Sequence, residues 1–159
     1  MTKLIIYRKL INKDINLINN LILNEKREYD QYLNMGWSLN QIVGQLTKKT
    51  NFSFGAFYNN ILVSFVLGDL FNIEKISEYE ILLIYVRKIY RKKGIATKLI
   101  RKLEVNSNCL KKIYLEVSNN NHEAISFYKK MNFSKVYIRK DYFISDKKKF
   151  DAIAMHKSY

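Results

Sequence analysis

The sequence of 159 residues contains no proline, only five glycines and a single cysteine. Turns must therefore be made mainly by asparagine, aspartate and serine. No disulfide can form within the chain, which fits a reducing compartment. No stretch approaches the roughly 18 uncharged apolar residues of a membrane-spanning helix, and Arg8 and Lys9 interrupt the first apolar run, which argues against a signal peptide. We therefore expect a cytoplasmic protein without a membrane partner.

Acidic residues are scarce as well. Asp and Glu number 14 against 28 Lys and Arg, which gives a formal net charge of +14. An acidic partner, such as nucleic acid, a membrane surface or a phosphorylated cofactor, would suit this excess. Lys, Asn, Ile and Tyr are abundant throughout, so compositional bias is an equally simple explanation. Only a local cluster of cations therefore indicates a binding site. The length and the 48% apolar content suit one globular domain over residues 1–159.

Hydrophobic periodicity predicts four helices and seven strands. Two asparagines, Asn59 and Asn60, indicate a hairpin turn, Ser38 is a candidate helix N-cap, and Cys109 is expected as a small buried residue before a strand. The order mixes hairpins with two β-α-β crossovers, which predicts an α/β fold. Its central mixed, mostly antiparallel sheet has helices on both faces and the apolar strand 78–86 at its centre. The expected strands are 4–10, 52–58, 61–71, 78–86, 111–117, 134–143 and 150–157, and the helices 13–26, 38–49, 94–104 and 121–131.

The first motif is ILLIYVRKIYRKKGIATKL, in which Arg91, Lys92 and Lys93 stand directly before Gly94 at the start of a helix. The helix dipole disfavours cations at this end. Unpaired N–H groups at a helix start bind anions such as a pyrophosphate, and a glycine lets the anion approach the main chain. A basic loop exposed to solvent is the alternative.

The second motif is YLEVSNNNHEAISFYKKMNF. Glu116 lies in an otherwise apolar strand, where a carboxylate is costly unless it has a partner or a function. Simple alternation would place it on a solvent face, Tyr128 could be a core aromatic, and Asn121 could be a helix N-cap. The residues alone leave these alternatives open.

Together the two motifs resemble a known family. The segment from Arg91 to Ala96 resembles the (Arg/Gln)-x-x-Gly-x-(Gly/Ala) signature of the GCN5-related N-acetyltransferase (GNAT) superfamily, and NNNHEAISFYKKMNF resembles its second signature. The segments GWSLNQI, IRKDYF and DAIAM resemble the RimI-type ribosomal-protein-alanine N-acetyltransferases. Two departures exist: the basic loop lacks the usual Asp-Pro, and Asn132 replaces the glycine before Phe133. Asparagine tolerates the left-handed backbone that this turn requires.

The resemblance implies acetyl-CoA (coenzyme A) as cofactor and a protein N-terminus, such as that of a ribosomal protein, as acceptor. It implies that Glu116 is the general base, that Tyr128 is the general acid for the leaving thiolate, and that the Val86 N–H stabilises the oxyanion. No metal is implied, because His122 and His156 are isolated. The cofactor-binding residues that the resemblance implies are Ile84, Tyr85 and Val86 for the acetyl and pantetheine arm, Arg91, Lys92, Lys93, Gly94, Ile95, Ala96 and Thr97 around the pyrophosphate, and Asn121 for the pantetheine arm.

Two other functions remain open: a small-amine N-acetyltransferase for polyamines or antibiotics, and a basic nucleic-acid-associated module with a vestigial cofactor site. The retained pair Glu116 and Tyr128 argues against the second, so no specific nucleic acid is expected. The segments IRKDYF and DAIAM resemble the hairpin that lies over the acceptor groove of the family, which favours a protein acceptor.

Overall fold

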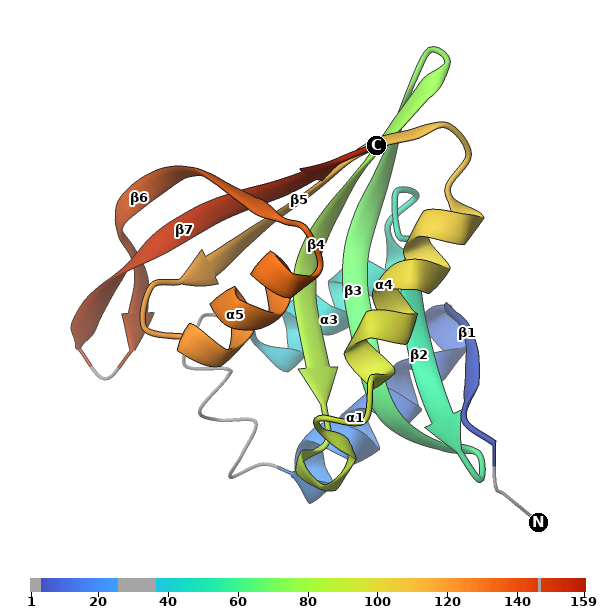
Figure 1. The fold of residues 1–159 in the computed structure, drawn as a ribbon. Helices are drawn as coiled ribbons and strands as arrows, with labels where there is room; N and C mark the ends of the chain where they lie inside the picture. The colour runs from blue at the N-terminus through green and yellow to red at the C-terminus, as the bar shows by residue number, and fades with distance from the viewer. Residues whose placement is uncertain (1–3, 26–36, 146) are drawn as a thin grey trace.

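The computed structural model describes residues 4–25, 37–145 and 147–159. Seven strands form one mixed sheet with helices on both faces (Figure 1), so the predicted fold class and element order are confirmed. The strands are β1 (Ile6–Leu10), β2 (Ser53–Tyr58), β3 (Ile61–Ile73), β4 (Ile76–Val86), β5 (Leu110–Ser118), β6 (Ser134–Ser145) and β7 (Lys148–Ser158). The helices are α1 (Ile15–Asn24), α3 (Leu39–Thr47), α4 (Ile95–Asn106) and α5 (His122–Lys130), with short 3-10 turns η1 (Asn12–Asp14) and η2 (Lys88–Tyr90).

The order of the strands in the sheet is β1-β2-β3-β4-β5-β7-β6, which puts β4 at the centre as its apolar sequence predicted. The strands β4 and β5 are parallel neighbours, because α4 connects them as a crossover. The other neighbouring pairs are antiparallel.

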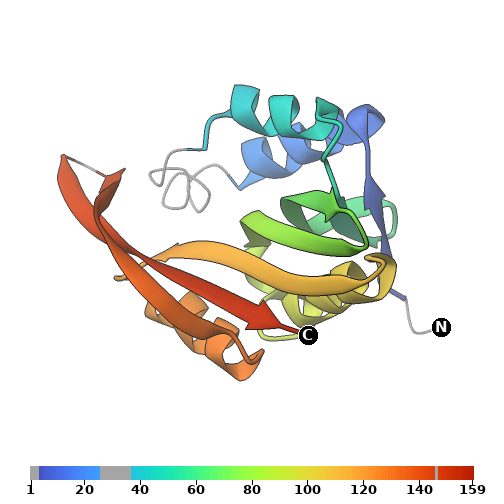
Figure 2. The same cartoon turned by 90° about the horizontal axis from the view of Figure 1, so that it is seen from above.

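The helices form two layers. Helices α1 and α3 cover one face of the sheet, and α4 and α5 cover the other (Figures 1 and 2). Each layer of helices packs on a hydrophobic core of its own. Leu99, Leu103 and Tyr79 belong to the core under α4 and α5, and Ile18 and Phe65 belong to the core under α1 and α3. Among the helices that the structure describes, none is long and apolar enough to cross a bilayer.

Turns follow the asparagine chemistry that the sequence predicted. Asn59 and Asn60 have φ of 50° and 64° and join β2 to β3, and Asn132 has φ of 66° after α5. The Ser38 hydroxyl accepts a hydrogen bond from the backbone N–H three residues on, at 3.3 Å, and caps α3. Cys109 precedes β5 as predicted, but the expectation of burial was wrong: the residue is exposed in a left-handed turn with φ of 50°.

Candidate active site

A bulge in the central strand creates the site. Across the β3–β4 ladder Leu67 pairs with Leu83 and Gly68 pairs with Ile81, so Leu82 is an extra residue in β4. The bulge changes the phase of the strand, and Ile81 and Ile84 then pack on the same core although they are three residues apart. The β4–β5 pairing ends at Ile81 opposite Leu115. Beyond this point β4 follows β3 and β5 follows β7, so the two parallel strands part.

A cavity of about 980 Å³ lies where the strands part. Its walls are the ends of β4 and β5, the start of α4, and helix α5. Ligands of open α/β sheets bind at such a place, outside the carboxyl ends of parallel strands. Of the predicted site residues, the lining contains Ile84, Val86, Arg91, Lys92, Gly94, Ile95, Ala96, Thr97, Glu116, Asn121 and Tyr128.

Two predicted cofactor residues lie outside this lining. Tyr85 alternates to the opposite face of β4, where its side chain is 1% exposed in the core under α1 and α3, and its carbonyl accepts a hydrogen bond from Ser64 Oγ at 2.7 Å. Lys93 is exposed, and its Nζ lies 5.5 Å from the centre of the Tyr90 ring. The side chain of Tyr85 is therefore turned away from the cavity, whereas Lys93 lies outside the lining but near Tyr90, which belongs to it.

The basic turn before α4 is built from left-handed residues. Lys92 has φ of 57° and Gly94 has φ of 74°, a region that glycine enters without cost. The first hydrogen bond of the helix runs from the N–H of Lys98 to the carbonyl of Gly94, at 3.0 Å. The N–H groups of the three residues between them therefore belong to the open end of the helix. A Cβ built on Gly94 would meet nothing within 4 Å, so this turn is open to an approaching anion.

Two cations frame this turn in different ways. Arg91 donates from Nε to the carbonyl of Val86, at 3.0 Å, and so ties the turn to the end of β4. The Lys92 Nζ lies 3.9 Å from a carboxylate oxygen of Glu123 at the start of α5, and both side chains are highly exposed. An exposed pair of this kind contributes little to stability, so Lys92 can turn to a phosphate at small cost.

Glu116 is the acidic residue that the sequence placed in an apolar strand. Its neighbours Leu115 and Val117 are buried on the α4 and α5 side, so alternation turns Glu116 to the opposite face. There its side chain is 22% exposed and accepts hydrogen bonds from Arg139 Nη1, at 3.1 and 3.4 Å. Glu116 also lines the cavity. Alternation along β5 thus turns Glu116 away from the core under α4 and α5, and this orientation is compatible with a function in the cavity. The role of Glu116 as a general base stays a prediction.

A second carboxylate lies near Glu116 and was missed by the sequence analysis. Glu80 is on β4, opposite Tyr114 of β5 and Asp69 of β3. Glu80 is exposed at the surface, but partial desolvation of its carboxyl group by the surrounding protein raises its pKa from 4.5, and the negative charges of Asp69 and Glu116 raise the pKa further. Alternation with the buried residues Tyr79 and Ile81 turns Glu80 to the other face of the sheet, but only the β4–β5 register shows that Glu116 lies near it on that face.

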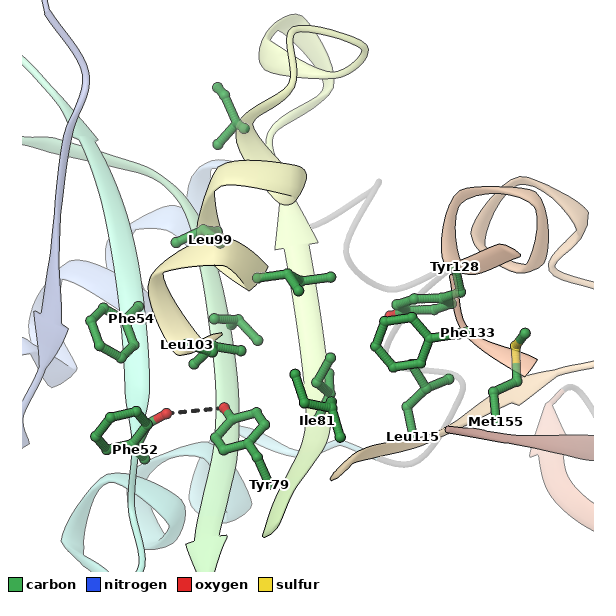
Figure 3. Packing of buried hydrophobic residues seen from close by; sticks show 14 of the residues in the cluster. Phe52, Phe54, Tyr79, Ile81, Leu99, Leu103, Leu115, Tyr128, Phe133 and Met155 are labelled. Atoms are coloured by element: carbon green, nitrogen blue, oxygen red, sulfur yellow. Dashed lines mark hydrogen bonds between the residues drawn. The ribbon is translucent and has the colours of Figure 1, made fainter. Parts of the chain in front are cut away.

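Tyr128 combines a packed ring with a place in the cavity wall. It is 5% exposed, and its ring centre lies 5.5 Å from that of Phe133 and 5.3 Å from that of Phe127. Figure 3 shows Tyr128 and Phe133 side by side, close to Leu115. Tyr128 is therefore a packed core aromatic, as one alternative from the sequence proposed. Because Tyr128 also lines the cavity, the prediction of an acid function stays open.

Asn121 is the N-cap of α5, as one alternative proposed. Its side-chain oxygen accepts a hydrogen bond from the N–H of Ala124, at 3.1 Å. The same residue lines the cavity. Since the oxygen is used in the cap, the amide NH₂ is the group of Asn121 that could serve the predicted pantetheine contact.

The end of α1 is fastened to the end of β4 by an ion-pair cluster that the sequence did not suggest. Glu25 accepts hydrogen bonds from Tyr85 Oη at 2.7 Å, from Arg87 Nε at 2.9 Å and from the N–H of Lys88 at 3.3 Å. Burial acts to raise the pKa of Glu25, but these donors prevail and lower it. The cluster holds the two elements together beside the cavity. Further lining residues not singled out from the sequence include Trp37, Phe127 and Phe143.

Comparison with known proteins identifies the family of the chain and shows which solved structures share its fold. The model of the Acetyltransferase (GNAT) family matches residues 18–133. A curated N-alpha-acetyltransferase from Saccharolobus solfataricus is 44% identical over 63 residues, and the alignment covers 38% of this chain and 38% of that protein, well under half of its length.

Two solved structures share the fold over almost the whole chain. NAA60 from Arabidopsis thaliana, in complex with a bisubstrate analogue, has a TM-score of 0.80 at 18% identity and covers 98% of both chains; the same protein was also solved with acetyl-CoA. The ribosomal-protein-S18-alanine N-acetyltransferase from Escherichia coli has a TM-score of 0.76 at 18% identity, over 98% of this chain and 94% of that one. The family model spans well over half of the sequence, including both motifs, and the chain therefore belongs to the GNAT family of acetyltransferases.

Proposed function

We propose that this protein transfers the acetyl group of acetyl-CoA to the N-terminal α-amine of a protein. The observation that carries the proposal is the cavity between the parted ends of β4 and β5, with an open helix start at one end, Glu116 in one wall and Tyr128 in another. The curated relative and the E. coli neighbour, both N-acetyltransferases of proteins, support the same acceptor class. Residues 1–159 form a single catalytic domain in this proposal.

The cavity lining fits acetyl-CoA from its phosphates to its thioester. The N–H groups from Ile95 to Thr97, with Lys92 beside them, offer hydrogen bonds and positive charge to a pyrophosphate. The edge of β4 at Ile84 and Val86 offers main-chain groups to the pantetheine arm, since β4 has left β5 by this point. The cofactor supplies an activated acetyl thioester, and the chain must supply orientation and proton transfer.

In this proposal Glu116 and Tyr128, in different walls of the cavity, carry out the proton transfers. A protein α-amine has a pKa of about 7.7–8.0, so removing its proton near neutrality is a modest task for Glu116, directly or through water. The N–H of Val86 supplies a hydrogen bond to the oxygen that becomes negative when the amine attacks the thioester. Tyr128 donates a proton to the departing thiolate. Glu80 adds a second negative charge near Glu116, which attracts the acceptor ammonium.

A ribosomal protein with a small first residue is the acceptor that we favour, and the reaction would then take place in the cytoplasm. The test is acetylation of peptides that begin with alanine, each made with a free N-terminus and with a blocked N-terminus plus one free lysine. We expect acetylation of the free α-amine only. Because a lysine side chain has a pKa of about 10.4, it is almost wholly protonated at neutral pH and is poorly matched to a single carboxylate base.

Variants of Glu116 separate its role from simple packing. Glu116→Gln should lower the rate at neutral pH by about 10²–10⁴-fold. Part of the loss should be recovered at higher pH, where the amine loses its proton unaided. If the blocked peptides or a panel of polyamines and aminoglycosides are acetylated as fast as the free peptides, the protein is a lysine or small-amine acetyltransferase and the proposal is wrong.

A further inference from the structure

The counter-ion of Glu116 comes from a strand that is not its neighbour. Glu116 of β5 pairs with Ala154 of β7, and Ala152 of β7 pairs with Arg139 of β6. Neighbouring strands are about 4.8 Å apart, so the Arg139 side chain crosses β7 to reach Glu116. It can do so because the two β7 residues between them are alanines, whose short side chains leave room for the arginine to pass over the strand. The contact is thus a consequence of the DAIAM segment.

Arg139 is held loosely in this position. A single nitrogen, Nη1, lies 3.1 and 3.4 Å from the two oxygens of Glu116, instead of the paired contacts of a bidentate bridge. The Arg139 side chain is 52% exposed, and its guanidinium stacks on the Tyr142 ring at 4.2 Å from the ring centre. Exposed ion pairs of this type are weak. The guanidinium can therefore leave Glu116 while it remains on the aromatic ring.

The acceptor amine needs the same carboxylate. Both oxygens of Glu116 are engaged by one guanidinium nitrogen, so an arriving ammonium meets a cation already at this position. Two cations about 4 Å apart repel each other even at a solvated site. Glu80 adds a negative charge that attracts the ammonium, but it leaves Arg139 in place on both oxygens of Glu116. Lys140, the next cation of β6, is engaged by Asp151 at 2.9 Å and does not compete for Glu116.

We propose that Arg139 determines specificity for the second residue of the acceptor: it releases Glu116 to the α-amine and pairs instead with an acidic side chain at position two. This inference rests on the proposed function. An extended peptide advances about 3.3–3.6 Å per residue, so the second residue of an acceptor whose amine is at Glu116 stays within reach of the long arginine side chain. An acidic second residue replaces the lost partner, whereas a basic one adds a third cation.

The experiment compares three free N-terminal peptides that differ only in the second residue: Ala-Asp, Ala-Gln and Ala-Arg. We expect kcat/KM to be about fivefold higher for Ala-Asp than for Ala-Arg, the size of an exposed ion pair, with Ala-Gln between them. Arg139→Gln should bring this ratio to about one, and Arg139→Glu should invert it. The control is Lys140→Gln, which removes the same charge from the next residue of β6 and should keep the wild-type ratio.

The possible results are distinct. If Arg139→Gln and Lys140→Gln reduce the ratio equally, the preference comes from the net charge of +14 and the inference is wrong. A wild-type preference for Ala-Arg also contradicts it. Equal acetylation of all three peptides on the α-amine contradicts the specificity but leaves the proposed function intact. If no free α-amine is acetylated, the proposed function fails, and the inference fails with it.

Discussion

Replacing Gly94 with a charged residue tests whether the basic turn binds the cofactor phosphates. Gly94 has φ of 74°, and nothing lies within 4 Å of a Cβ placed there, so a small side chain fits the protein without a clash. Asparagine tolerates this backbone region better than most residues. Gly94→Asn and Gly94→Asp have nearly the same shape, and the difference between them therefore isolates one negative charge.

The size of the effect follows from Coulomb's law. Two unit charges roughly 5 Å apart repel by about 1 kcal/mol in bulk water and about 3 kcal/mol at an effective dielectric constant of 20. Gly94→Asp should thus bind acetyl-CoA about 5- to 150-fold more weakly than Gly94→Asn, since about 1.4 kcal/mol corresponds to tenfold. A negative charge at a helix start stabilises the helix by about 0.3–1 kcal/mol. The Asp variant should accordingly melt no lower than the Asn variant.

The assay is titration calorimetry of acetyl-CoA with both variants, next to thermal melts of the proteins without ligand. Weaker binding together with unreduced stability has one cause, the repulsion between the new carboxylate and a bound phosphate. Equal affinity of the two variants would refute the placement of the pyrophosphate at this turn.

Two further variants probe the walls of the cavity. Tyr128→Phe should retain the edge-to-face contact with Phe133 and the affinity for acetyl-CoA, but lower kcat by about 10²–10⁴-fold, because the hydroxyl is needed only when the thiolate leaves. Full activity at saturating substrates would show that Tyr128 is only a packed aromatic. The pKa of Glu80 is raised from 4.5, first by desolvation and then by the charges of Asp69 and Glu116. The folded protein therefore binds this proton more tightly than the unfolded chain. As a result, the free energy of unfolding falls as the pH rises from 4.5 toward the folded pKa. Because the Glu80 side chain is exposed and water weakens these charge effects, Glu80→Gln should raise the melting temperature only slightly at neutral pH and leave it nearly unchanged well below pH 4.5. A lower melting temperature at neutral pH would contradict this sign.

Much of the fold could be predicted from local sequence patterns. The apolar run of β4 indicated a central strand, and the left-handed asparagines at 59, 60 and 132 indicated the turns that the structure contains. The same run concealed the bulge at Leu82, because a strand that is apolar on both faces gives no sign of a change in phase. Cys109 was placed correctly before the strand, but its burial was predicted wrongly, because the sequence does not mark the left-handed turn that exposes it.

The candidate site was predictable only where residues are close in the sequence. The turn around Gly94 and the pair of Glu116 and Tyr128 belong to two continuous motifs. Glu80 and Arg139 were missed because they reach Glu116 through the sheet register, across β4–β5 and across β7. A single sequence does not contain this register, and the reach of Arg139 also depends on two small residues on the intervening strand.

The parting of β4 and β5 also affects how the molecule holds together. The four N-terminal strands and the three C-terminal strands share one short parallel ladder, from Ser77 opposite Leu110 to Ile81 opposite Leu115. A ligand in the cavity contacts residues on both sides of this ladder and so links the two groups of strands. Cofactor binding then also stabilises the folded protein against unfolding, by about 2.7 kcal/mol when the cofactor is present at 100 times its Kd. Cofactor binding in this cavity is therefore expected to oppose opening of the sheet along the β4–β5 ladder.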